Sequence, residues 1–173
     1  FCGIGAARAV DIPITGLKLI VVDKIAVAGK AKAVFVAKDP AVSKGTGTDP
    51  SQIEATLDIA YDSVSGTFLM PQGSNWLVNS GSVAKYSNKT APTGGTVKVS
   101  VIKPGSMVKV VGRSLGDAPL DLSVPLTGPV YVVHTIVNGG DETRLCTQFT
   151  GCVRKGIPGG YKLICKNSST GDP

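Results

Sequence analysis

Strict alternation of apolar and polar residues is the dominant pattern along this chain. Every second residue of IEATLDIAY (53–61), starting at its first, is apolar, and TVKVSVIK (96–103) places its valines in the same way. A period of two residues is typical of a β-strand that buries one face. Similar segments are AKAVFVAK (31–38), SMVKVVGR (106–113), YVVHTIV (131–137) and the more continuously apolar GLKLIVV (16–22). The pattern therefore predicts an all-β protein.

Turn residues separate the predicted strands, and the chain contains 22 Gly and 11 Pro. TVKVSVIK and SMVKVVGR, joined by Pro104-Gly105, predict a β-hairpin, and Asn138-Gly139-Gly140-Asp141 predicts another tight turn. The one helical candidate is a turn at Asp49-Pro50-Ser51-Gln52, with Asp as the cap and Pro at the first helical position. We expect less than about a tenth of the chain to be helical and about nine or ten strands. They would form one antiparallel β-sandwich domain of jelly-roll or Greek-key type over residues 14–173.

Composition supports a globular protein with a basic surface. Of its 173 residues, 42% are hydrophobic and 17% charged, and the net charge is +6. Many lysines alternate with apolar residues in the predicted strands, namely Lys18, Lys32, Lys38, Lys85, Lys98, Lys109 and Lys162. We interpret these lysines as solvated strand faces and protected sheet edges, with a polyanion-binding surface as the alternative. Aromatic residues make up only 5%, which leaves few platforms for stacking bases and predicts no specific nucleic-acid partner.

The candidate catalytic motifs do not fit the predicted strands. Ser82-Val83-Ala84-Lys85 matches S-x-x-K, whose chemistry needs a helix to bring the lysine to the serine. Gly139-Gly140-Asp141-Glu142 fits a polar hairpin turn better than a catalytic signature. His134, the single histidine, lies within an alternating segment and is expected to be structural. We therefore expect no enzyme activity, no cofactor and no metal. No apolar run reaches the ~20 residues of a transmembrane helix.

Four cysteines and the start of the chain predict export. Residues 7–9, Ala-Arg-Ala, match the A-x-A pattern of signal-peptidase cleavage. An even number of cysteines without a C-x-x-C motif then favours disulfides in an oxidising compartment. If RLCTQF (144–149) and YKLICK (161–166) pair as a hairpin, Cys146 bonds to Cys165 and leaves Cys2 for Cys152. Spacing alone allows three connectivities, so the pairing stays open. The expected location is extracellular or at the cell surface.

The C-terminal stretch TRLCTQFTGCVRKGIPGGYKLICK is the most distinctive part of the chain. Its LCTxF…C…GGxxKLxCK pattern resembles a β-domain that recurs in predicted secreted bacterial proteins of unknown function. LKLIVVDK and AKAVFVAKDP extend the likeness more loosely. The resemblance implies export and an all-β fold, and it implies no activity.

The first 13 residues allow two interpretations. They are either a remnant of an export signal or an extended arm that adds a strand to a neighbouring subunit, with Ile4, Ala6 and Arg8 facing one way. Such head-to-tail insertion does not close on itself and yields a filament. The leading expectation is therefore a secreted structural subunit that forms a homo-polymer in a filament or surface layer. The alternative is a cell-surface module that binds carbohydrate or polyanion, and a hydrolase ranks third.

Overall fold

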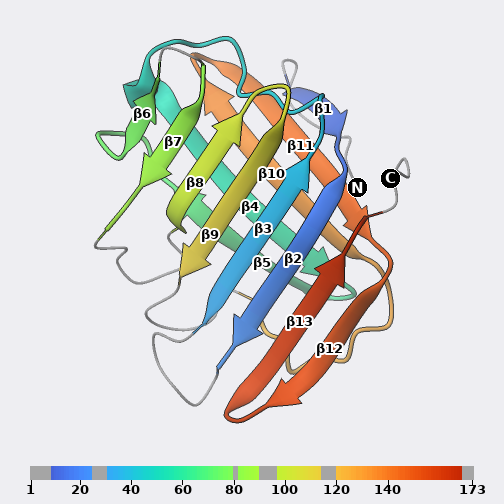
Figure 1. The fold of residues 1–173 in the computed structure, drawn as a ribbon. Coiled ribbons are helices and arrows are strands. Elements are labelled where there is room, and N and C mark those ends of the chain that lie inside the picture. The colour runs from blue at the N-terminus through green and yellow to red at the C-terminus, as the bar shows by residue number, and fades with distance from the viewer. Residues whose placement is uncertain (1–8, 25–30, 80–81, 90–96, 114–119, 169–173) are drawn as a thin grey trace.

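The computed structural model describes residues 9–24, 31–79, 82–89, 97–113 and 120–168. Two β-sheets pack face to face and form a sandwich (Figure 1). In order across the sheet, the five-stranded layer contains β1 (Ala9–Pro13), β11 (Asp141–Phe149), β10 (Val130–Asn138), β4 (Ile53–Tyr61) and β5 (Val64–Met70). The eight-stranded layer contains β12 (Cys152–Ile157), β13 (Gly160–Lys166), β2 (Gly16–Asp23), β3 (Lys32–Lys38), β9 (Met107–Arg113), β8 (Val97–Lys103), β7 (Ala84–Ser87) and β6 (Trp76–Val78).

The predicted all-β sandwich is confirmed, with more strands than expected. The described residues contain thirteen strands instead of nine or ten, because a segment as short as the three residues of β6 shows no clear alternation. The predicted helical turn is present as a 3₁₀ helix at Pro50–Gln52. Asp49 caps this turn by accepting a hydrogen bond from the backbone N–H of Ser51 at 2.9 Å.

Both predicted turns close hairpins. β8 and β9 pair up to Lys103 and Met107, and Gly105 between them has a φ of +68°. Gly139 and Gly140 connect β10 to β11 with φ values of +66° and +92°. Glycine adopts these left-handed conformations without the steric cost that a Cβ atom brings.

The hydrophobic core fills the space between the sheets. Its largest buried side chains include Trp76, Tyr61 and Phe68, each of which is worth about 2 kcal/mol or more when removed from water. The indole N–H of Trp76 donates to the carbonyl oxygen of Pro71 at 3.0 Å, so its polar atom is not left unpaired. Gly112 of β9 faces Phe68 of β5 so closely that a Cβ atom there would lie 2.5 Å from the ring.

The chain passes from one sheet to the other near its start. β1 pairs in parallel with β11, and the next residue, Ile14, donates its N–H to the carbonyl oxygen of Cys146 at 2.8 Å. The chain then enters the eight-stranded sheet at Gly16. Residues 9–13, which the sequence assigns to an arm, thus form a strand of the chain's own sheet. The rest of that segment, with Ile4, Ala6 and Arg8, lies outside the described residues.

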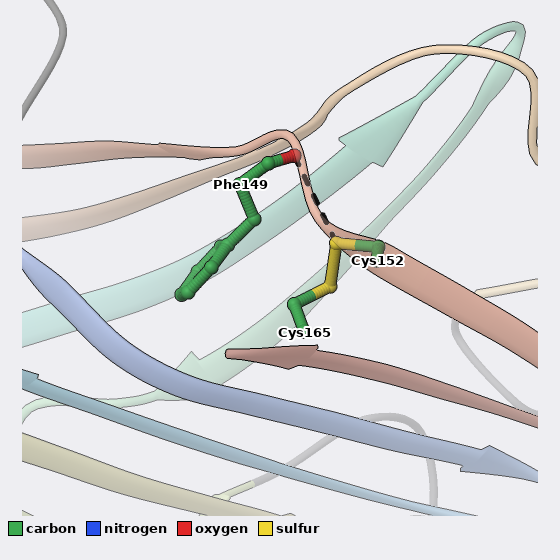
Figure 2. The surroundings of a disulfide bond; sticks show 3 residues. All are labelled: Phe149, Cys152 and Cys165. Carbon is green, nitrogen blue, oxygen red and sulfur yellow. Dashed lines mark hydrogen bonds between the residues drawn. A yellow bond between two sulfur atoms is a disulfide. The ribbon is translucent and has the colours of Figure 1, made fainter. Parts of the chain in front are cut away.

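The predicted disulfide pairing is wrong. Cys152 is bonded to Cys165, and these two residues face each other across the β12–β13 hairpin with their Cα atoms 4.2 Å apart (Figure 2). The hairpin expected from RLCTQF and YKLICK does not form, because after Phe149 the chain leaves the five-stranded sheet and begins β12 in the other layer. Cys146 therefore lies in a different sheet from Cys165.

The same bond excludes the second predicted pair, Cys2–Cys152. Cys146 is also part of a disulfide, and its partner lies outside the described residues, as does Cys2. The prediction that the cysteines are oxidised is correct for the three that the structure describes, Cys146, Cys152 and Cys165.

Candidate functional site: the lysine face

The outer face of the eight-stranded sheet carries an unusual number of lysines. On each strand, the residues that alternate with the buried ones point away from the core. Nine lysines occupy such outward positions: Lys18, Lys32, Lys38, Lys85, Lys103, Lys109, Lys155, Lys162 and Lys166. We call this outer surface the lysine face. The eight-stranded sheet that carries it is the layer nearest the viewer in Figure 1.

The lysine face contains no carboxylate on its strands. The one acidic residue in these eight strands is Asp23, which is 1% exposed and lies on the inner side of the sheet. The ion pairs found within the described residues involve Arg144 of the other sheet, with Asp11 and Glu142. The positive charges of the lysine face are therefore not neutralised by acidic partners from the described residues, and their fields add.

An apolar row crosses the middle of the lysine face. The residues of this row lie directly opposite one another on six neighbouring strands, and all are β-branched: Val153, Ile164, Ile20, Val34, Val111 and Val99. Five of them are half-buried, and Val153 on the edge strand β12 is 51% exposed. Because this row faces outward, it lies outside the core between the sheets.

Lysines flank the apolar row on both sides. The register places Lys166, Lys18, Lys109 and Lys85 in a first lysine row, with Val36 and Val101 between them. A second lysine row on the opposite side contains Lys155, Lys162 and Lys32, with Val22 between the last two. Beyond the first row, Lys38 and Lys103 lie on either side of Met107 and form a third row.

Sheet order changes our interpretation of these lysines. The edge strands of this sheet are β12 and β6, so protection of an open edge explains Lys155 alone among the nine. Lys18, Lys32 and Lys109 lie on β2, β3 and β9 in the interior of the sheet. The prediction that the lysines lie on solvated strand faces is confirmed for five of the seven that the sequence analysis named, which are exposed; Lys98 and Lys162 are half-buried. The sequence analysis missed that they share one face.

The opposite face of the sandwich has a different charge. Outward positions of the five-stranded sheet include Asp11, Glu54, Asp58 and Glu142, with Arg144 as a basic residue among them. A pocket of about 380 Å³ lies on this side, lined in part by Asp58, Asp62 and Tyr131. Its carboxylates already accept hydrogen bonds from the hydroxyl groups of threonines 56, 67 and 127. The hydroxyl and the backbone N–H of Thr127, which both donate to Asp62, hold the pKa of Asp62 below its usual value.

His134 and Asp23 are ionisable side chains that are buried between the sheets. His134 is fully buried, and its Nδ1–H donates to the carbonyl oxygen of Thr56 at 2.8 Å. Loss of hydration lowers the pKa of His134 to about 4. Burial acts oppositely on Asp23 and raises the pKa of its carboxyl, although one oxygen accepts from the N–H of Leu122 at 3.1 Å. The position of His134 agrees with the predicted structural role.

The other sequence motifs adopt the expected local structure. Ala84 and Lys85 of the S-x-x-K match belong to β7, a strand rather than a helix, and Lys85 points outward into the first lysine row. Gly139 and Gly140 form a hairpin turn. The described residues contain no group of three or more His, Cys, Asp or Glu placed to hold a metal ion. They also contain no helix that is long and apolar enough to cross a membrane.

Comparisons with protein families, with curated proteins and with solved structures found no match to this chain.

Proposed function

We propose that this chain is a secreted, non-enzymatic module that binds anionic polymers at the cell surface through the lysine face. The observation that carries the proposal is the set of nine outward lysines on seven of the eight strands, without one outward carboxylate on any of the eight. Such a surface attracts polyanions, both by a summed field and by local ion pairs with sulfate, carboxylate or phosphate groups. The Cys152–Cys165 disulfide is compatible with an extracellular location.

Self-assembly through an N-terminal arm, the function that the sequence favours first, stays a prediction. Ile4, Ala6 and Arg8 lie outside the described residues, and residues 9–13 pair with the chain's own β11. Polyanion binding rests instead on described residues with a defined register, and for this reason we place it first.

Charge variants test the proposal. Each lysine near an anionic surface contributes about 1 kcal/mol, so replacing Lys18, Lys32 and Lys109 by glutamine is expected to weaken binding to heparin about a hundredfold. Isothermal titration calorimetry at about 100 mM NaCl measures the change, because the Debye length is then about 10 Å and charges far from the ligand are screened. All three side chains are exposed, so the fold is expected to survive, and far-UV circular dichroism checks this.

A matched control changes the net charge by the same amount elsewhere. Ser65→Glu, Leu69→Glu and Lys89→Gln also lower the charge by three, at exposed positions outside the eight-stranded sheet. This triple variant is expected to keep its affinity within about threefold, since long-range effects of net charge are screened by salt. An equal loss in both variants would contradict a specific role of the lysine face.

A further inference from the structure

The arrangement of the lysine face defines the shape of its ligand, and this inference rests on the proposed function. We infer that the lysine face binds one linear acidic polysaccharide, which runs across the strands along the apolar row. Three features lead to this inference: the straight apolar row, the lysine rows on both of its sides, and the absence of aromatic groups.

The apolar row gives a direction to the face. Its six residues lie at one level on consecutive strands, from Val153 on β12 to Val99 on β8. Neighbouring strands are about 4.8 Å apart, so the row extends over about 24 Å. A linear chain that follows this row crosses the strands at right angles and meets a β-branched side chain on each of the six strands.

The two lysine rows form the sides of this track. Lys162 and Lys166 lie on the same strand, on either side of Ile164. Because a β-strand rises about 3.3 Å per residue, these two positions, four residues apart, are about 13 Å apart along the backbone. This is the backbone distance between the first and the second lysine row. The flexible side chains of lysine bury their stems along apolar surface and can turn their ammonium groups inward over the row. A single chain is therefore contacted from both sides, whereas a broad planar surface would meet all three lysine rows equally.

The chemistry of the face favours a polysaccharide over a nucleic acid. Single-stranded nucleic acids gain much of their affinity when bases stack on aromatic side chains. The outward positions of the eight described strands hold mainly lysine and aliphatic residues and no Trp, Phe or Tyr. Neutral sugars would likewise find no aromatic platform and few hydrogen-bonding groups, so the charged groups of an acidic polysaccharide must supply the recognition.

Pairs of charge reversals distinguish a track from a diffuse basic surface. Lys18→Glu/Lys109→Glu removes two lysines of the first row, and Lys32→Glu/Lys162→Glu removes two of the second. Lys38→Glu/Lys103→Glu changes the third row of the same face by the same net charge. With size-fractionated heparin oligosaccharides as the probe, the first two variants are expected to lose at least tenfold in affinity. The third is expected to lose clearly less than either of them, because its lysines lie outside the track and do not contact the bound chain.

The length of the probe gives an independent readout. Affinity is expected to rise with oligosaccharide length until the chain reaches about 24 Å, the length of the apolar row, and then to level off. Longer chains gain only a small further increase, because they can bind in more than one register. Equal losses in all three variants would overturn the track but leave the proposed function intact. Equal or tighter binding of oligo-dT, or of vesicles containing phosphatidylserine, would overturn the assignment to an acidic polysaccharide. If no polyanion binds at all, both the inference and the proposed function fail.

Discussion

The single histidine makes the folded state sensitive to acid in a defined pH range. His134 is fully buried, and its Nδ1–H donates a hydrogen bond to the carbonyl oxygen of Thr56. Its Nε2 has no hydrogen-bond partner among the described residues. A carbonyl oxygen can only accept, so Nδ1 carries the proton and the ring is neutral. A second proton on Nε2 would place an unpaired charge between the sheets, and this cost lowers the pKa of His134 from 6.5 to about 4.

The sign of the effect follows from proton binding. Between pH 6.5 and 4 the unfolded chain binds a proton at this histidine and the folded chain does not, so stability falls as the pH falls. The contribution of His134 to the free energy of unfolding is fully present above pH 6.5, and it is lost as the pH falls to the folded pKa of about 4. At 1.36 kcal/mol per pKa unit, the full effect is about 3 kcal/mol, and about 2.5 kcal/mol of it is lost between pH 7 and pH 4.5.

Urea denaturation at pH 7, 5.5 and 4.5 measures this loss. His134→Gln keeps a donor for the carbonyl group of Thr56, but its side chain does not titrate in this pH range. The free energy of unfolding of the variant is therefore expected to lack the pH-dependent part that His134 contributes. Asp23, whose pKa is raised, acts with the opposite sign, but it is present in both proteins and cancels in the difference. A difference between wild type and variant that does not change with pH would refute the reasoning.

Nuclear magnetic resonance provides the same test without a variant. The chain has one histidine, so its ring signals need no further assignment. We expect the ring proton shifts to stay constant between pH 7 and pH 5, since His134 remains neutral there. A midpoint near 6.5 in the folded protein would show that the ring is hydrated.

Three further predictions concern the fold and the N-terminus. Cys152 and Cys165 are 13 residues apart in the sequence, and replacing both by alanine is expected to lower the free energy of unfolding by about 3 kcal/mol. Urea denaturation under non-reducing conditions measures this loss, and an unchanged midpoint would contradict the bond. Gly112→Ala is expected to lower the free energy of unfolding by about 1–3 kcal/mol, because it forces a Cβ atom onto a buried phenylalanine ring. Gly156→Ala is the control: its Cβ atom meets no atom within 4 Å, so the free energy of unfolding should change by less than about 0.5 kcal/mol. If residues 1–9 form an assembly arm, their deletion abolishes polymers in sedimentation velocity without unfolding the chain, and unchanged assembly contradicts the arm.

The fold class could be predicted because it depends on local patterns. Alternation in segments such as IEATLDIAY reports one buried face, and turns such as Pro104-Gly105 report the ends of strands. Those signals need no knowledge of which strands become neighbours. The capped turn at Asp49 is local in the same way, and it too was predicted correctly.

The disulfide and the lysine face depend on sheet order, which local patterns do not encode. In β12, Arg154, Lys155 and Gly156 follow one another and interrupt the alternation, so the hairpin that joins Cys152 to Cys165 has a weak sequence signal. Lys18 and Lys109 share a row because β3 lies between their strands. One signal was available from the sequence: AKAVFVAK, TVKVSVIK, SMVKVVGR and GLKLIVV each contain lysine and no acidic residue, whereas IEATLDIAY contains two acidic residues and no lysine.

The salt dependence of polyanion binding tests the central claim most directly. Seven lysines form the first and second rows, and if each displaces a counterion from the polymer, affinity should fall about a thousandfold between 50 and 200 mM NaCl. Titration of the wild-type protein with heparin over this range gives the slope of log Kd against log salt. We predict a slope of about 5, estimated from the value for single-stranded polyelectrolytes. A slope below about 1, or no binding at 50 mM NaCl, would contradict the assignment of the lysine face as a polyanion-binding surface.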